Sequence, residues 1–273
     1  MGEMLFFSGG VTAAIKRLYR KFFCCGGYGV HSPFVFDLIT NVIEEQKPYY
    51  CYERLHSVRL QLLQLPDEVT CRRRKLTVKK AFAKYCFTAT EDRLLFRLAN
   101  CFRPKTIYAA GSDFGLTPLY LTAYSKDSEC IVYEPEPHIA AIAHEFVKKY
   151  ASASVVICEN SPKIPEKLDF MVWGHSFTVF LGENKNAGEN KDTDENKDTG
   201  ETFSMQTFEQ FLPYIHDESV MVIAGIHTST ENRKTWKSIC SHPKVTVTLD
   251  LCRLGIIFFN PKFHRKTYKS VVL

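Results

Sequence analysis

From residue 105 onward, the sequence alternates between short apolar runs and longer segments whose apolar residues recur at helical spacing. Such runs are typical of strands buried on both faces, and strands that alternate with helices predict a parallel sheet covered on both sides. The runs are KTIYAAG, CIVYEPEP, SVVICEN, LDFMVWG and SVMVIAGIH, followed by VTVTLDL and LGIIFFN. Only Cys252 and Arg253 separate the last two, which is too short for a parallel crossover, so these strands must pair antiparallel. The pattern predicts an α/β fold with a Rossmann-like, doubly wound, mostly parallel seven-stranded sheet and an antiparallel last strand.

The first part of the chain carries helical periodicity instead. The segments VTAAIKRLYRKFF, SPFVFDLITNVIEEQ, YERLHSVRLQLLQLP and TEDRLLFRLANCFRP have the amphipathic pattern of helices. Ser32 and Thr90 are predicted as N-caps, with Pro33 at the first helical position of its segment. We therefore expect a helical N-terminal leader or cap over residues 1–95 and an α/β domain over residues 96–273.

One segment breaks this scheme. Residues 182–201 form a near-perfect six-residue repeat, GENKNA, GENKDT and DENKDT, with almost no apolar side chain. Such a segment cannot bury enough surface to offset the entropy of ordering its backbone. We expect a disordered insertion after the fourth strand, and the sequence does not assign it a function.

Composition and charge narrow the classes of partner only slightly. The chain has 273 residues, 45% of them hydrophobic, and a net charge of +5 from 35 basic and 30 acidic residues. The basic excess has one local source, CRRRKLTVKK at 71–80, which we interpret as a solvated helix face or loop. No aromatic-rich RNA-binding motif accompanies it, so the sequence does not favour a nucleic-acid partner.

The cysteines and the longest apolar stretches indicate the cellular compartment in which the protein is expected. None of the ten cysteines forms a C-x-x-C pair, so neither a zinc site nor a disulfide framework is supported. The N-terminus has Glu3 where a signal peptide carries positive charge, and no run of about 18 apolar residues occurs. We expect a reducing, cytoplasmic setting without a membrane span.

The first strand of the predicted sheet runs into a glycine-bearing turn. The sequence AGSDFG places Gly111 and Gly115 between that strand and the next helix. Backbone N–H groups at such a turn, together with the helix N-terminus, suit an anion or a closely approaching cofactor. Glycine is common wherever a strand turns into a helix, so this signal alone leaves a purely structural turn open.

An acidic residue at the tip of the second strand strengthens the cofactor hypothesis. Glu134 lies 23 residues after Gly111, near the separation at which an acid binds the two hydroxyls of a ribose. The complete G-x-G-x-x-G phosphate fingerprint is absent. A ligand with a ribose but no pyrophosphate therefore fits better than a dinucleotide, and S-adenosylmethionine is such a ligand.

These features together resemble the class I S-adenosylmethionine-dependent methyltransferases, in particular small-molecule O-methyltransferase-like proteins of an uncharacterised bacterial branch. AAGSDFGLTPLYLTAY is similar to the first motif of the family, and IVYEPEPHIAAIAHEFV to the second, with Glu134 at the ribose position. VVICENSPKIPEKLDFMVW resembles the third and fourth strands, which puts Asn160 near the adenine. The resemblance implies that Gly111, Ser112, Asp113 and Gly115 also bind the cofactor, S-adenosylmethionine.

The chain also departs from the family pattern. The first-motif acid that helps hold the ammonium end of the cofactor is replaced by Ala109. Metal-dependent members carry acidic or amide ligands after strands four and five, where this chain has Gly174, Ala224 and Gly225. Because a hard cation needs several oxygen ligands, the sequence predicts metal-independent chemistry with no metal site.

Two histidines follow strands whose ends reach the predicted cleft. His175 and His227 could each deprotonate a substrate hydroxyl, given a suitable partner, and are the candidate catalytic bases. The first hypothesis is methyl transfer from S-adenosylmethionine to an oxygen or nitrogen atom of a small molecule. The alternative is a non-catalytic binding or scaffold protein that keeps the fold, and homo-oligomerisation is left open.

Overall fold

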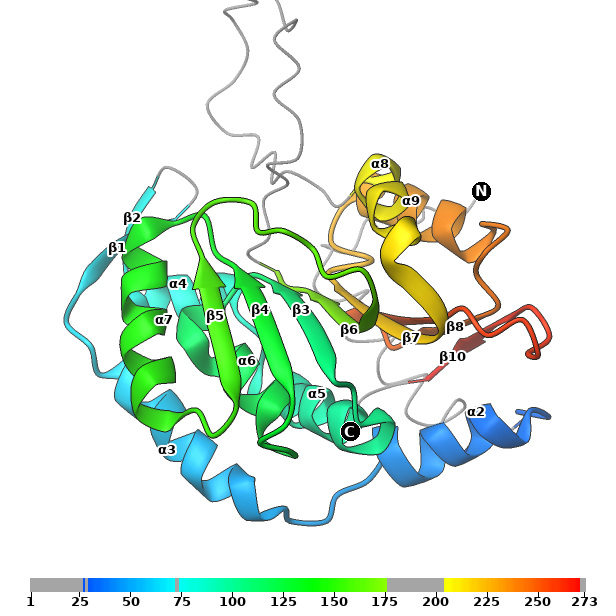
Figure 1. The fold of residues 1–273 in the computed structure, drawn as a ribbon, viewed down its shortest axis with the longest axis horizontal. Helices are drawn as coiled ribbons and strands as arrows, with labels where there is room; N and C mark the ends of the chain where they lie inside the picture. The colour runs from blue at the N-terminus through cyan, green and yellow to red at the C-terminus, as the bar shows by residue number, and fades with distance from the viewer. Residues whose placement is uncertain (1–26, 28, 72–73, 176–203, 271–273) are drawn as a thin grey trace, which may run out of the picture.

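The computed structural model describes residues 27, 29–71, 74–175 and 204–270. Within these ranges a single large sheet of eight strands forms the centre of the protein (Figure 1). In chain order the strands are β3 (Thr106–Ala110), β4 (Glu129–Tyr133), β5 (Ser154–Cys158), β6 (Leu168–Trp173), β7 (Ile215–Ala224), β8 (Val247–Asp250), β9 (Leu254–Phe258) and β10 (Lys266–Lys269). Their spatial order is β10-β8-β9-β7-β6-β3-β4-β5.

The strand directions agree with the predicted fold class. β5, β4, β3, β6 and β7 pair in parallel, whereas β9 runs antiparallel to both β7 and β8. All seven predicted strands are present, and the short link through Cys252 and Arg253 joins an antiparallel pair as expected. β10 was not predicted; it extends the sheet by pairing in parallel with β8.

Helices cover both faces of the sheet because the central strands bury both of their sides. Ile107 and Ala109 of β3 lie in the core under α5 and α7, whereas Tyr108 and Ala110 face the core under α8 and α9. Another layer, built from α3 and α4, packs onto α6 and α7. The described helices are α2 (Pro33–Leu38) with its π-helical continuation (Ile39–Ile43), α3 (Tyr50–Leu63), α4 (Val78–Tyr85), α5 (Ala89–Phe102), α6 (Leu116–Thr122), α7 (Pro137–Tyr150), α8 (Met205–Phe211) and α9 (Thr230–Cys240).

The N-terminal part of the described chain departs from an all-helical leader. Strands β1 (Glu68–Cys71) and β2 (Arg74–Thr77) form a small antiparallel hairpin, and α4 follows it directly. The basic stretch 71–80, interpreted as a solvated helix face or loop, therefore contributes to a hairpin strand and to a helix start. The amphipathic pattern missed the hairpin because four-residue strands carry too little periodicity to be recognised.

The predicted helix starts are confirmed in one case and corrected in another. Ser32 caps α2, accepting a bond from the Val35 amide at 3.4 Å. α5 begins earlier than predicted: its N-cap is Thr88, not Thr90, because Thr88 and Glu91 form a reciprocal capping box.

The predicted domain boundary falls within a helix, and two other predictions concern residues that the structure does not describe. The expected boundary between residues 95 and 96 lies inside α5, which runs unbroken from Ala89 to Phe102. The predicted first helix and the 182–201 repeat lie outside the described residues. In the part that is described, no helix has both the length and the apolar character needed to span a bilayer.

Candidate cofactor site

The loop after β3 turns the chain into α6 through a run of left-handed residues. Gly111 has φ 90°, and Asp113, Phe114 and Gly115 follow with φ of 47°, 58° and 90°. A Cβ at Gly115 would lie 3.0 Å from the Ala143 carbonyl oxygen of α7. Gly115 thus allows α7 to pack closely against the loop, which is a structural role beside the predicted cofactor contact.

Glu134 is buried at the tip of β4 and faces the loop rather than open solvent. The residue is only 2% exposed, and its Oε2 accepts bonds from the Ser112 amide at 2.9 Å and the Ser112 hydroxyl at 2.8 Å. From the described residues, its Oε1 accepts one long bond, 3.4 Å, from the Glu136 amide. Burial raises the pKa of Glu134 to about 7, although the Ser112 donors oppose this shift.

Asp113 is similarly buried and approaches the segment that precedes α5. Its Oδ2 accepts a 2.8 Å bond from the Phe87 amide. Burial raises the pKa of Asp113 to about 6, against the lowering effect of the Phe87 bond. The loop and the adjoining strand tip therefore hold two carboxylates whose ionised forms are both disfavoured by burial.

The linker from α4 to α5 crosses the carboxyl ends of the central strands at this point. The Phe87 ring contacts the His175 ring edge-on, with centroids 5.2 Å apart. Arg253 Nε donates to Glu91 Oε1 at 2.6 Å, and Arg253 Nη2 lies 3.5 Å from His175 Nε2. His175, the first candidate base, thus contacts both an aromatic ring and a member of an ion pair.

His227, the second candidate base, has a carboxylate partner. Its Nε2 lies 2.8 Å from Asp250 Oδ2 at the end of β8, and Asp250 Oδ1 accepts a 3.0 Å bond from the Cys252 amide. The imidazole remains 36% exposed while the Asp250 side chain is nearly buried. A carboxylate that orients one ring nitrogen leaves the other nitrogen to face a substrate, as a general base requires.

Three further positions from the sequence analysis lie in or just after β5, β3 and β6. Asn160 is exposed, two residues beyond β5, and β5 lies beside β4, so Asn160 follows the strand next to Glu134. Ala109 is fully buried in the core under α5. At Gly174, a Cβ would lie 3.0 Å from the Ala110 carbonyl oxygen and 3.9 Å from Asp113 Oδ1.

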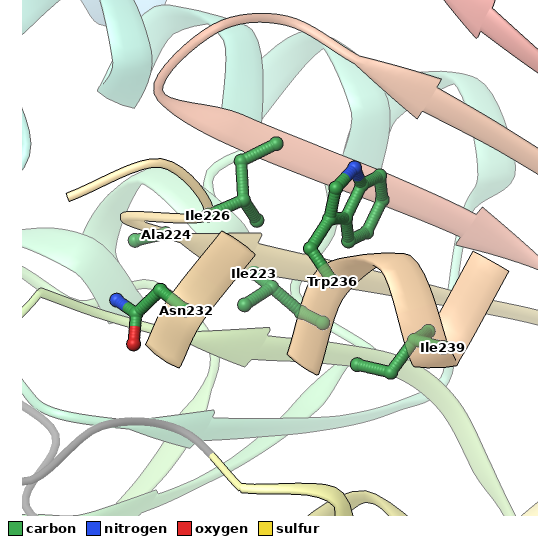
Figure 2. A pocket seen from close by; sticks show the side chains of 6 residues that line it. All are labelled: Ile223, Ala224, Ile226, Asn232, Trp236 and Ile239. Atoms are coloured by element: carbon green, nitrogen blue, oxygen red, sulfur yellow. The ribbon is translucent and has the colours of Figure 1, made fainter. Parts of the chain in front are cut away.

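A cavity beside β7 is too small to be a cofactor site. It measures about 10 Å³, roughly the space of one water molecule. Figure 2 shows that Asn232 and Trp236 reach it from α9. The Asn232 amide nitrogen donates to the Gly225 carbonyl at 2.8 Å and the Thr228 hydroxyl at 2.7 Å, so this side chain holds the turn after β7.

The described residues contain no group of three or more His, Cys, Asp or Glu side chains placed to hold a metal ion.

Several contacts in the site could not be predicted from the sequence. Glu91 and Arg253 are 162 residues apart, and no local pattern links them. The Thr88-x-x-Glu91 capping box was a readable signal that places the α5 N-terminus beside the site.

Comparison with known proteins identifies the fold. No family model matches the sequence, and no curated protein does either. The S-adenosylhomocysteine-bound methyltransferase PaMTH1 of Podospora anserina superposes with a TM-score of 0.50 at 12% identity, covering 95% of this chain and 100% of that one. The O-methyltransferase TomG of Streptomyces achromogenes, solved with S-adenosylmethionine, gives a TM-score of 0.48 at 12% identity, over 83% of this chain and 95% of that one. The chain therefore has the Rossmann-like α/β fold of that Podospora anserina methyltransferase.

Proposed function

We propose that the protein binds S-adenosylmethionine over the carboxyl ends of β3, β4 and β5 and transfers its methyl group, without a metal ion, to an oxygen or nitrogen atom of a small molecule. The observation that carries this proposal is Glu134, an under-donated carboxylate at the tip of β4 beside the Gly111 turn. A buried acid with a raised pKa at the ends of parallel strands is a mark of a functional site.

The residues present fit the nucleoside half of this cofactor. Glu134 Oε1 has capacity for the two ribose hydroxyls, since its present donor is one amide at 3.4 Å. Asn160 follows the neighbouring strand, where an adenine edge would lie, and its exposed amide can both donate and accept. Glu134 is only 2% exposed, so a ribose reaches it only after the covering side chains move apart.

When bound, S-adenosylmethionine supplies an electrophilic methyl group on a sulfonium. The protein's own contribution is alignment of the acceptor with that methyl and removal of the acceptor's proton. We assign the proton transfer to His227, because Asp250 holds its Nε2 at 2.8 Å. His175 is the second candidate, since Arg253 and Phe87 fix its ring beyond the end of β6.

The alternative function is non-catalytic binding on the same fold. It is supported by the burial of Glu134 against Ser112 and by the replacement of expected acids by Ala109 and Gly174. This alternative predicts that the site stays closed to the nucleoside, so the two functions differ in a binding measurement.

Titration calorimetry with S-adenosylmethionine and S-adenosylhomocysteine tests the proposal. We expect the wild-type protein to bind both, and Glu134→Gln to weaken both by about ten-fold or more, because a charge-assisted bond to the ribose is lost. Glu136→Gln is the matched control, since that side chain lies two residues along the same loop, and its affinities should match the wild type. Absence of wild-type binding to either ligand would reject the proposal in favour of the scaffold function.

A further inference from the structure

Arg253 lies at the carboxyl edge of the sheet, although it belongs to the link between β8 and β9. Because β9 runs antiparallel to β7, its first residue, Leu254, pairs with Ala224 at the end of β7. The Arg253 carbonyl oxygen accepts a 2.7 Å bond from the Gly225 amide, and the Arg253 amide donates to the Leu251 carbonyl at 2.9 Å. The backbone of Arg253 is therefore fixed beside the turn that follows β7.

The side chain of Arg253 is held by one edge of its guanidinium. Nε donates to Glu91 Oε1 at 2.6 Å and Nη2 donates to Glu91 Oε2 at 3.4 Å, so the Nε–Nη2 edge faces the start of α5. Burial raises the pKa of Glu91, but the bonds from Arg253 and Thr88 outweigh burial and hold the pKa below its ordinary value, so the pair is ionised. The capping box with Thr88 fixes Glu91 in turn, and the guanidinium is anchored in one orientation.

The other edge of the guanidinium, Nη1–Nη2, is not occupied by Glu91. The Arg253 side chain is 53% exposed, whereas that of Glu91 is 4% exposed. Nη1 donates to no described residue, and Nη2 has one further described neighbour, His175 Nε2 at 3.5 Å. A guanidinium carries five N–H donors in a planar fork that matches a carboxylate with two parallel bonds. The Nη1–Nη2 edge thus keeps the geometry that recognises a second carboxylate.

Both candidate bases adjoin this arginine. A Cβ at Gly225 would lie 3.7 Å from His175 Nδ1, so the His175 ring lies between the Arg253 side chain and the turn after β7. His227 follows in that turn, and its partner Asp250 ends β8, directly before the link that carries Arg253. A molecule bound to Arg253 therefore lies next to both groups that we assign to proton transfer.

We propose that Arg253 binds a carboxylate group of the methyl acceptor, so that the substrate is a small organic acid whose hydroxyl or amino group is methylated. The acceptor role rests on the proposed function, whereas the carboxylate contact rests on the geometry of Arg253. The carboxylate only positions the acceptor and is not itself methylated. Because Glu91 places a negative charge on the other edge, a monoanion fits this fork better than a dianionic phosphate ester.

Benzoate and benzamide form a matched pair of probes, because they share a ring and differ in the carboxylate. NMR titrations of each into the ¹⁵N-labelled protein, with and without S-adenosylhomocysteine, follow the backbone signals of residues 251–255. We expect benzoate to bind at millimolar concentration and about ten-fold or more tighter than benzamide, because it alone forms the charge-assisted bidentate pair. Phenyl phosphate should bind no tighter than benzoate, and tighter binding would overturn the assignment to a carboxylate.

Variants of the two partners in the ion pair should give different results. Arg253→Gln should lose the preference, so that the two probes bind within about two-fold of each other. Glu91→Gln is the matched control: glutamine can still form the capping box with Thr88, and loss of the nearby negative charge should keep the preference or strengthen it by up to about three-fold. Arg253→Lys keeps a positive partner for Glu91 but lacks the planar fork, so it should weaken benzoate by about three-fold or more even if Arg253→Gln is unstable.

The outcomes distinguish this inference from the proposed function. If the wild type does not prefer benzoate, or if Arg253→Gln and Arg253→Lys both keep the wild-type preference, the ion pair only joins α5 to the link and the inference is overturned, while the proposed function stands. If the wild type prefers benzoate through Arg253 but does not bind S-adenosylhomocysteine, the proposed function fails. The carboxylate contact then stands, and its role in holding a methyl acceptor is overturned.

Discussion

Two acidic sites lie at opposite ends of the central strands, and they differ in how their carboxylates are satisfied. At the amino end, Asp169 of β6 accepts from the Lys105 and Thr106 amides at 2.7 and 2.9 Å and pairs with His216 Nε2 at 3.0 Å. Burial raises the pKa of Asp169, but the Thr106 and Lys105 bonds outweigh burial and hold the pKa below its ordinary value. This carboxylate ties the starts of β3, β6 and β7 together.

At the carboxyl end of the strands, burial outweighs the hydrogen-bond donors, and the pKa values are raised. Burial raises the pKa of Glu134 to about 7 and that of Asp113 to about 6, because their donors are too few to offset it. The comparison shows that a carboxylate with several donors stabilises the fold, whereas a buried one with few donors is costly to keep.

Removing the saturated acid should have the largest effect on stability. Asp169→Ala removes the acceptor of an exposed and a part-buried backbone N–H group at the start of β3, so we expect a loss of about 1–3 kcal/mol in the free energy of unfolding. Chemical denaturation measures the change. Binding of S-adenosylhomocysteine should be unaltered, and a greater stability loss in Glu134→Gln than in Asp169→Ala would contradict the comparison.

The pH dependence of stability should separate the two ends. Asp113 and Glu134 have folded pKa values raised above their unfolded values, so their stabilising contribution is complete below about pH 4 and is lost as the pH rises through about 6 and 7. Asp169 has a lowered pKa, so its contribution exists above its unfolded value and is lost as the pH falls through the folded value.

Unfolding of the ligand-free protein at about pH 5 and about pH 8 measures this difference. The double variant Asp113→Asn, Glu134→Gln should gain stability over the wild type at the higher pH, by about 1–3 kcal/mol, and lose most of that advantage at the lower pH. An advantage that is equal at both pH values would mean that ionisation of these two acids is not the cause.

The smallest effect is expected from the exposed partner of Asp169. His216→Ala removes a partly exposed hydrogen bond and leaves both backbone donors in place, so the loss should be below about 1 kcal/mol. Thermal unfolding of His216→Ala and Asp169→Ala under the same conditions compares the two losses of stability directly. Equal losses in the two variants would show that the histidine, rather than the backbone bonds, stabilises this end of the sheet.

Much of the sheet was predictable because buried strands appear in the sequence as apolar runs. All seven predicted strands are present, and the two-residue link at Cys252 required the antiparallel pair. β10 was missed because KTYK carries no apolar run, and its place depends on pairing with β8 across the chain. Local pattern therefore predicted the centre of the sheet better than its edge.

That Glu134 lies beside the glycine loop was predictable from sequence, but the bonds between them were not. The spacing of Glu134 from the glycine loop located the candidate site, yet the bonds from Ser112 to Glu134 depend on the left-handed path of the loop. The partnership of His227 with Asp250 joins the turn after β7 to the end of β8, which the sequence pattern does not encode. The cofactor-binding and catalytic roles of the predicted site residues stay predictions.

The central claim is that the under-donated acids at the carboxyl end are kept for a nucleoside ligand. A crystal structure of the protein grown with S-adenosylhomocysteine tests it most directly. We expect the ribose hydroxyls within hydrogen-bond distance of Glu134 Oε1. A ligand bound elsewhere, or a site with Glu134 still covered at saturating ligand, would contradict it.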